Sequence, residues 1–194
     1  MTDALSTEQL KAELRRDALA RRDALPAEER KAAAEAVAAR AFPLPVATGA
    51  IVSGFMPMQS EINPLPLMQK LAGVGARLAL PRIVGRGHPL SMRAWAFGAP
   101  LTRGQWSIRE PPADAPEIDP DILLVPLLAF DRAGYRIGFG AGYYDMTITA
   151  LRRRKAVVAV GLAFAAQEVP AVPRTERDAR LDLVLTEREV IDLR

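Results

Sequence analysis

The sequence predicts an α/β fold in which a largely parallel sheet is flanked by helices and preceded by an N-terminal pair of helices. Between residues 50 and 186, short apolar runs rich in Val, Ile and Leu alternate with segments of helical pattern. Near-continuous apolar runs are typical of strands that are covered on both faces. Their alternation with helices is typical of a parallel sheet. The first 42 residues contain no such run, which indicates a helical segment.

The first predicted helix covers residues 6–25. Ser6 and Gln9 stand three residues apart, which is the spacing of a capping box at a helix N-terminus. Apolar residues recur every four positions along one face, at Leu10, Leu14 and Ala18. A second helix is predicted to begin with Pro26 at its first position and to end at Arg40.

The remaining elements are predicted from apolar runs and helical spacing. Strands are expected at residues 50–55, 76–81, 90–97, 121–130, 156–164 and 181–186. Helices are expected near residues 64–73 and 143–153. The proline-rich segment 109–120 is predicted to be a long surface connection that can cover a site.

Length and composition are those of an ordinary globular protein, because 49% of the 194 residues are hydrophobic and 25% are charged. We expect one domain, residues 1–194, in which helices within 1–42 pack on an α/β core of residues 48–194. No apolar run approaches the roughly 18 residues that span a bilayer, and the N-terminus is polar. We therefore expect no signal peptide, no membrane anchor and a cytoplasmic location.

Cysteine and histidine usage excludes several kinds of site. The chain has no cysteine, which excludes a disulfide framework, a thiolate metal site and a cysteine nucleophile. Its single histidine, His88, excludes a His-rich metal centre. His88 stands in a glycine-flanked turn without a partnering motif, which is typical of a surface residue.

The charge distribution favours a small anionic ligand. The net charge is +3, and basic and acidic residues are interspersed, so no basic tail is available to follow a nucleic-acid backbone. The basic run at residues 152–155 ends a predicted helix, where positive charge complements the helix dipole. We expect a monomer with small-molecule ligands, and neither nucleic acid nor membrane as a partner.

The stretch GYRIGFGAGYYD, residues 134–145, is the most distinctive part of the sequence. It lies between the strand that ends near Pro126 and the helix that begins near Tyr143. Free backbone N–H groups at the start of a helix attract phosphate. Alternating glycines let a ligand approach the backbone closely. These glycines are Gly138, Gly140 and Gly142.

This glycine spacing matches neither standard nucleotide motif. No Gly-Lys-Ser/Thr follows, as a Walker A loop requires, and Tyr143 stands where the dinucleotide fingerprint needs a glycine. From the glycines alone, a plain strand-to-helix turn is as good an interpretation as a phosphate loop. Together with Tyr143 and Tyr144, two charged residues favour phosphate: Arg136 can grip phosphate oxygens, and Asp145 can hold the magnesium that accompanies a nucleotide.

The sequence FDRAGYRIGFGAGYYD, residues 130–145, closely resembles the signature of the 5-formyltetrahydrofolate cyclo-ligase, or methenyltetrahydrofolate synthetase, family. The family carries Phe-Asp, a glycine and then Arg-Leu-Gly-x-Gly-x-Gly-Tyr-Tyr-Asp. Ile137 replaces the usual leucine, and Met146 stands where arginine is common. The similarity extends over most of the chain, through KAELR, FMPMQSEI, LPR, GLAFAAQ and RDARLDLVLT.

The resemblance implies a three-layer, NagB/RpiA-like fold and an activity. That activity is the conversion of 5-formyltetrahydrofolate to 5,10-methenyltetrahydrofolate, which uses ATP and Mg²⁺ and releases ADP and phosphate. By the same resemblance, Asp145 and Asp178 would bind magnesium, and Lys11, Arg136 and Tyr143 would serve catalysis. ATP would contact Lys11, Arg15, Arg136, Ile137, Gly138, Phe139, Gly140, Ala141, Gly142, Tyr143 and Tyr144. The folate would contact Met56, Glu61, Trp106, Phe139, Gly140, Gly142 and Tyr143.

The residues themselves support these roles to different degrees. Lys11 and Arg15 are four apart and project from one helix face, although a solvated face explains that spacing as well. Glu61 follows a predicted strand, where ligands of α/β sheets gather, and its carboxylate can pair with the two-nitrogen edge of a pterin. A plain surface charge explains Glu61 equally well. Asp178 and Asp182 are both candidate metal ligands, and only the resemblance favours Asp178.

Two other functions remain open from the sequence. The chain can be a non-catalytic or RNA-associated member of the same fold, although it shows neither an eroded loop nor an added RNA-binding segment. It can also be a sugar-phosphate isomerase-like enzyme, because a glycine-rich phosphate loop does not by itself specify folate. Such an enzyme would turn over without ATP.

Overall fold

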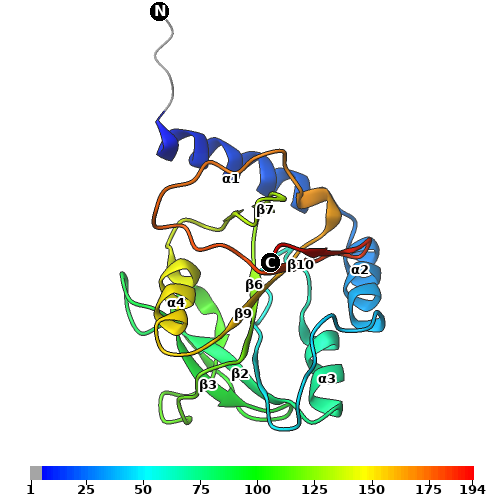
Figure 1. The fold of residues 1–194 in the computed structure, drawn as a ribbon, viewed down its shortest axis with the longest axis vertical. Helices are drawn as coiled ribbons and strands as arrows, with labels where there is room; N and C mark the ends of the chain where they lie inside the picture. The colour runs from blue at the N-terminus through cyan, green and yellow to red at the C-terminus, as the bar shows by residue number, and fades with distance from the viewer. Residues whose placement is uncertain (1–5) are drawn as a thin grey trace, which may run out of the picture.

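A computed structural model describes residues 6–194 and contains a seven-stranded sheet in the order β11-β10-β9-β6-β1-β2-β3 (Figure 1). The five inner strands are parallel, and the edge strands β3 and β11 run antiparallel to their neighbours. The predicted α/β class with a mostly parallel sheet is therefore confirmed. The strands are β1 (Ile51–Ser53), β2 (Arg77–Arg82), β3 (Ser91–Trp95), β6 (Ile122–Pro126), β9 (Val158–Leu162), β10 (Leu183–Leu185) and β11 (Val190–Asp192).

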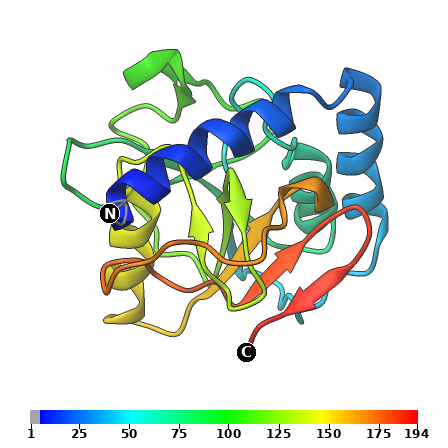
Figure 2. The same ribbon diagram turned by 90° about the horizontal axis from the view of Figure 1, so that it is seen from above.

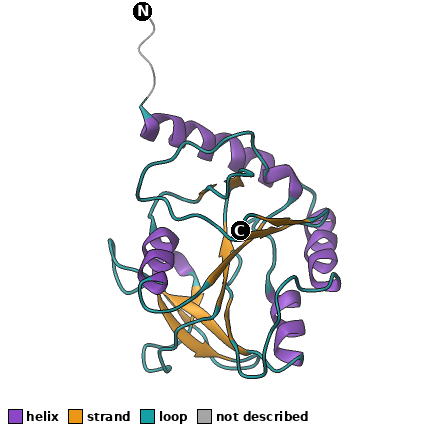
Figure 3. Ribbon diagram, viewed as in Figure 1, coloured by secondary structure: helices purple, strands orange, loops and turns teal. Residues whose placement is uncertain are grey.

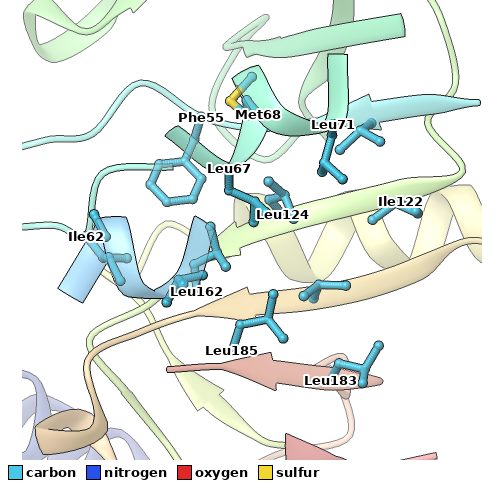
Figure 4. Packing of buried hydrophobic residues seen from close by; sticks show 14 of the residues in the cluster. Phe55, Ile62, Leu67, Met68, Leu71, Ile122, Leu124, Leu162, Leu183 and Leu185 are labelled. Atoms are coloured by element: carbon cyan, nitrogen blue, oxygen red, sulfur yellow. The ribbon is translucent and has the colours of Figure 1, made fainter. Parts of the chain in front are cut away.

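Helices cover both faces of the sheet, which makes three layers (Figure 3). Helices α2 (Ala27–Ala39) and α3 (Leu65–Gly73) pack on one face, and α4 (Tyr143–Arg152) packs on the other. On β6, Leu124 points toward α3 while Leu123 points toward α4, because successive strand residues face opposite sides. Figure 4 shows the first of these clusters, in which α3 residues meet apolar residues of β6, β9 and β10.

Helix α1 (Thr7–Asp23) crosses the hairpin of β7 (Ala129–Phe130) and β8 (Arg136–Ile137) and reaches the 3₁₀ turn η2 (Ala165–Gln167) (Figure 2). The predicted capping box is present, since Gln9 N–H donates to Ser6 Oγ and Ser6 N–H donates to the Gln9 side chain. Within residues 6–194, no helix has the length and apolarity that a membrane span needs.

The prediction of one strand over residues 121–130 is wrong. β6 ends at Pro126, and β7 pairs with β8 in a separate two-stranded sheet. Between β7 and β8, the Asp131 carboxylate accepts the backbone N–H groups of Ala133 and Tyr135 at 3.0 and 2.9 Å. These bonds form a turn directly after β7, so the chain folds back before the glycine-rich stretch begins.

Several short elements were missing from the prediction because two or three residues carry no periodic signal. Part of the proline-rich connection forms strand β5 (Arg109–Glu110), which pairs with β4 (Thr102–Arg103) across the turn η1 (Gln105–Ser107). Glu110 is buried and forms an ion pair with Arg82 at 2.9 Å, which fixes this hairpin to β2. The edge strand β11 was not predicted. Pro26 caps α2 instead of occupying its first position.

Candidate active site

The glycine-rich loop, residues 138–142, connects β8 to the N-terminus of α4. Gly142 adopts a left-handed conformation as the N-cap of α4, with φ 70°, and no side chain caps the helix. Gly140 has φ 99°, and a Cβ placed there would lie 3.3 Å from Arg15 Cζ. Both positions therefore favour glycine, because the backbone is left-handed and α1 lies close to the loop.

Helix α1 carries two of the predicted phosphate-binding residues, one of which contacts this loop and the other Asp178. Arg15 Nε donates to the Gly138 carbonyl oxygen at 3.1 Å. Lys11 is only 6% exposed, and its Nζ lies 2.8 and 2.6 Å from the two carboxylate oxygens of Asp178. Both side chains leave α1 on the side that faces the loop and Asp178, so this surface of α1 is not a solvated one.

Arg136, in β8 directly before the glycine-rich loop, is buried and already paired. Its Nη2 lies 3.0 Å from Asp145 Oδ1, and its Nη1 donates to the Ala179 carbonyl oxygen at 2.7 Å. Burial lowers the pKa of Arg136, and the Asp145 carboxylate opposes that shift. Asp145 Oδ1 also accepts the Ala179 N–H at 2.9 Å. The loop arginine, Asp145 and the 178–179 segment thus form one connected network.

The structure separates the two candidate aspartates. Asp178 lies beside Lys11; burial raises the pKa of its carboxyl, but hydrogen bonds from Lys11 and Thr175 outweigh that effect and lower it. Asp182 instead accepts hydrogen bonds from Ala159 N–H and Arg152, both at 2.7 Å. Of the two, only Asp178 is joined to a predicted phosphate-binding residue.

The donor set fits a magnesium ion that is completed by phosphate. Among residues 6–194, no three His, Cys, Asp or Glu side chains are grouped to hold a metal by themselves. Mg²⁺ usually takes one or two carboxylates and fills its remaining positions with water and phosphate oxygens. Asp145 Oδ2 makes no hydrogen bond within the described part of the chain, whereas Asp178 would exchange its contact with Lys11 for the metal.

A pocket of about 350 Å³ is lined by residues of two segments. One wall comes from residues 56–65, which follow β1 at the carboxyl ends of the parallel strands, where ligands of open α/β sheets bind. The other wall comes from residues 106–109. The pocket brings together Met56 and Trp106, which are 50 positions apart in the sequence and were both predicted to contact the folate.

Tyr143 connects this pocket to the glycine-rich loop. Its ring centroid lies 6.0 Å from that of Trp106 at a tilt of 58°, and its hydroxyl donates to Gln105 Oε1 at 3.5 Å. Tyr143 is also the first residue of α4, directly after Gly142. A ligand in the pocket and a ligand on the loop would therefore meet at this tyrosine.

Glu61 and Tyr144 lie deeper, behind the pocket wall. Burial raises the pKa of Glu61, although the Met58 N–H, which donates to Glu61 Oε2 at 2.8 Å, and the charge of Arg22 both oppose this. Burial also raises the pKa of Tyr144, and the nearby Glu61 charge raises it further. Of the predicted folate residues, Met56 and Trp106 line the pocket, whereas Glu61, Phe139, Gly140, Gly142 and Tyr143 lie outside its lining.

Arg22 is a charged residue of this region that the sequence analysis missed. It lies on α1, seven positions after Arg15, and is only 1% exposed. Its Nε donates to Ser60 Oγ at 2.9 Å, and its Cζ lies 5.5 Å from the centroid of the Phe139 ring. The spacing of Arg22 could have indicated that it faces the site, since positions 11, 15, 18 and 22 share one helix face.

Comparisons with known proteins point to one family. The sequence profile of the 5-formyltetrahydrofolate cyclo-ligase family matches residues 7–187. A protein of that name from Mycolicibacterium smegmatis is 34% identical over 194 residues, covering 95% of this chain and 97% of the relative. Another, from Escherichia coli, is 32% identical over 180 residues, with coverage of 88% and 96%.

A solved structure gives the same result. The structure of 5,10-methenyltetrahydrofolate synthetase from Aquifex aeolicus superposes with a TM-score of 0.77 at 32% identity, covering 95% of this chain and 93% of that chain. Sequence and fold agree along nearly the whole length. This chain therefore belongs to the 5-formyltetrahydrofolate cyclo-ligase family.

Proposed function

We propose that this protein uses ATP, with Mg²⁺ as cofactor, to convert 5-formyltetrahydrofolate to 5,10-methenyltetrahydrofolate, releasing ADP and phosphate. Family membership supports the reaction. In this chain, the contact of Tyr143 with Trp106 is the observation that most supports the reaction. This contact joins a pocket of ligand size to the glycine-rich loop. A phosphoryl transfer from ATP to a folate requires two such adjoining sites.

The chemistry explains why the two ligands must meet. The N5-formyl group is an amide, so its carbon is a poor electrophile and its oxygen a poor leaving group. In the proposed reaction the formyl oxygen attacks the γ-phosphorus, the bond to ADP breaks, and an imidate phosphate forms. N10 then attacks the former formyl carbon, the N10 proton is lost, and phosphate leaves with the formyl oxygen. Because N10 and that carbon belong to one bound molecule, ring closure gains from proximity.

The residues around the loop suit the first step. Phosphoryl transfer mainly needs alignment of the reactants and stabilisation of charge on the transferred oxygens. Lys11, Arg15 and Arg136 can supply positive charge, and the uncapped N-terminus of α4 can supply backbone N–H groups. Asp145 and Asp178 would hold Mg²⁺, which neutralises phosphate charge when bound.

The residues of the pocket suit the folate. Met56 and Trp106 offer apolar and aromatic surface to the pterin and its neighbouring ring. Glu61 can accept hydrogen bonds from N3–H and the 2-amino group of the pterin. Tyr143 lies between this pocket and the loop, where it can position the formyl group toward the γ-phosphate.

Formation of the methenyl chromophore tests this proposal. Purified protein supplied with 5-formyltetrahydrofolate, ATP and Mg²⁺ should produce the chromophore, and omission of ATP should abolish it. If no chromophore forms above background, the proposal fails. If the protein turns over a sugar phosphate without ATP, the isomerase-like alternative replaces it, and binding of RNA without turnover would favour the non-catalytic alternative.

Other expectations from the sequence stay predictions. These are the single-domain organisation, the monomeric state, the cytoplasmic location and the absence of a nucleic-acid partner. Size-exclusion chromatography with light scattering would test the monomeric state directly.

A further inference from the structure

Arg22 is buried, charged and incompletely bonded. Its Nε is fixed by Ser60 Oγ, and Ser60 in turn donates to Asp23. Its Nη1 and Nη2 are buried from solvent and have no hydrogen-bond partner among residues 6–194. Buried N–H groups of a guanidinium are rarely left without acceptors, because the unpaired charge destabilises the fold. The free end of this side chain therefore requires an explanation.

The neighbours of Arg22 belong to the proposed folate site. Glu61 carries the largest opposing charge near it and favours its charged form, yet the two side chains form no ion pair. Phe139 of the glycine-rich loop lies against the guanidinium, with Cζ 5.5 Å from the ring centroid. Arg22 thus lies between the segment that carries Glu61 and the loop that carries Phe139.

The geometry points to Arg22 as the residue that binds the 4-oxo group of the pterin beside Glu61. This inference rests on the proposed function. Along one edge a 5-formylated pterin presents, in order, the O4 acceptor, the N3–H donor and the 2-amino donor. Glu61 offers a carboxylate to the two donors. A matching site needs a hydrogen-bond donor next to that carboxylate, and the two free N–H groups of Arg22 supply it.

The charge of Glu61 determines which ligand group Arg22 can bind. A phosphate of ATP or a carboxylate of the glutamate tail would bring a second negative charge close to Glu61, which is unfavourable in a buried site. A carbonyl oxygen brings none. O4 is also adjacent to the ring position that carries N5, so a donor at O4 fixes the orientation of the formyl group.

Phe139 must move for this contact to form. Its ring covers the guanidinium in the structure, but its side chain is 49% exposed and it stands next to Gly140, whose backbone is left-handed. The ring can therefore leave Arg22 without disturbing the core. The pterin then takes the place of the Phe139 ring against the guanidinium.

Paired ligands that differ at position 4 of the pterin test the inference. Equilibrium binding without ATP is measured for 5-formyltetrahydrofolate and for its 4-amino-4-deoxy analogue, in which an amino donor replaces O4 and N3 carries no hydrogen. The wild-type protein should bind the 4-oxo ligand at least about tenfold more tightly. Arg22→Met should weaken the 4-oxo ligand by about 10- to 100-fold, as expected for a hydrogen bond to a charged group, and the 4-amino ligand by less than about threefold.

Control variants separate recognition from folding. Arg16→Met removes an exposed arginine of the same helix, which pairs with Asp17, and should change neither affinity. If Arg22→Met weakens both ligands equally, or weakens ATP instead, the inference is overturned. If Arg22→Met does not fold, the wild-type preference alone decides, since equal binding of the two ligands contradicts an O4 donor. Intact methenyl formation together with any of these results would leave the proposed function standing.

Discussion

The two sides of the glycine-rich loop differ in how their charged residues are partnered. On the phosphate side, defined here by Lys11, Arg136, Asp145 and Asp178, each of these charged side chains forms an ion pair: Lys11 with Asp178, and Arg136 with Asp145. On the folate side, defined here by Arg22 and Glu61, the two opposite charges influence one another without pairing. The phosphate side is thus closed by its own contacts, and the folate side retains free donors and acceptors.

This difference teaches how each ligand is accommodated. Under the proposed function, ATP and Mg²⁺ would bring both signs of charge and could take over both halves of each ion pair. Phosphate oxygens would replace the aspartates beside Lys11 and Arg136, and magnesium would replace the cations beside Asp145 and Asp178. No charge is left alone in either state, which avoids the large cost of a buried unpaired ion. A pterin is neutral along its recognition edge and cannot make such an exchange. Its partners must already be free.

The largest effect is expected when the proposed metal ligand of the phosphate side, Asp145, is changed. Asp145→Asn keeps an acceptor for Ala179 N–H and Arg136 but removes the negative charge. We expect kcat to fall by on the order of 100-fold or more, because charge stabilisation at transferred phosphate oxygens depends on the metal. Turnover is measured across a Mg²⁺ titration. Asp182→Asn is the matched control, and a larger loss there than in Asp145→Asn would reverse the assignment of the metal ligands.

A smaller effect is expected for Arg136, whose replacement should change the affinity for ATP and not that for the folate. Arg136→Ala removes the loop guanidinium, so we expect ATP to bind about 10- to 100-fold more weakly while folate affinity changes less than about threefold. Isothermal titration with each ligand alone measures this. Arg132→Ala, which removes an exposed arginine of the same hairpin, should leave both affinities unchanged. Weaker folate binding with normal ATP binding in Arg136→Ala would mean that the loop faces the other ligand.

The pH dependence of folate binding tests the role of Glu61 on the folate side. Burial raises the pKa of Glu61 above its ordinary value of 4.5, and only the ionised carboxylate can accept from both pterin donors. Folate affinity should therefore fall as the pH is lowered through this raised pKa, approaching about tenfold per pH unit below it. Affinity is measured between pH 4 and 8. Glu61→Gln should bind weakly at every pH, and a variant that kept the wild-type profile would exclude Glu61 as the titrating group.

The same carboxyl group predicts a change in stability of defined sign. A raised pKa in the folded state means that folding favours protonated Glu61. The protonated carboxyl group therefore contributes to the free energy of unfolding fully below pH 4.5, and this contribution is lost as the pH rises through the raised pKa. In Glu61→Gln, the free energy of unfolding should therefore not decrease in this way as the pH approaches neutrality. Denaturation curves of wild type and Glu61→Gln at two pH values compare the free energies of unfolding.

The smallest expected effect concerns Trp106. Its side chain is 61% exposed and contacts Tyr143, so Trp106→Ala should change the free energy of unfolding by no more than about 0.5 kcal/mol. The KM for folate should rise by about three- to tenfold, as expected for one aromatic contact, with the KM for ATP unchanged. Phe97→Ala, an exposed aromatic residue outside the pocket, serves as control. An unchanged folate KM in Trp106→Ala would remove this residue from the folate site.

Much of the fold could be predicted because it follows from local patterns. The inner strands are near-continuous apolar runs, and the start of α1 carries a complete capping box. The prediction of one strand over residues 121–130 was wrong, because one apolar run serves two sheets. Residues 122–130 are apolar, yet they divide between β6 of the main sheet and β7, which pairs with β8 across the Asp131 turn. An apolar run shows that a segment is buried and does not show which sheet it joins.

The site could be predicted only as a set of residues. The glycine spacing, with Arg136 and Asp145, indicated a phosphate loop, and the resemblance added Met56, Trp106 and Asp178. The pairing of Lys11 with Asp178 could not be predicted, because these residues lie 167 positions apart. Arg22 was predictable in principle from helix spacing, but its isolation from acceptors depends on residues of three separate segments.

Transfer of the formyl oxygen tests the account most directly. 5-Formyltetrahydrofolate labelled with ¹⁸O in the formyl group is converted in the presence of ATP, Mg²⁺ and the wild-type protein, and the released phosphate is analysed by mass spectrometry. If the formyl oxygen attacks the γ-phosphorus, one labelled oxygen should appear in phosphate for each methenyl group formed. Methenyl formation with unlabelled phosphate would contradict a phosphorylated formyl intermediate, and with it the claim that the glycine-rich loop brings ATP and the folate together.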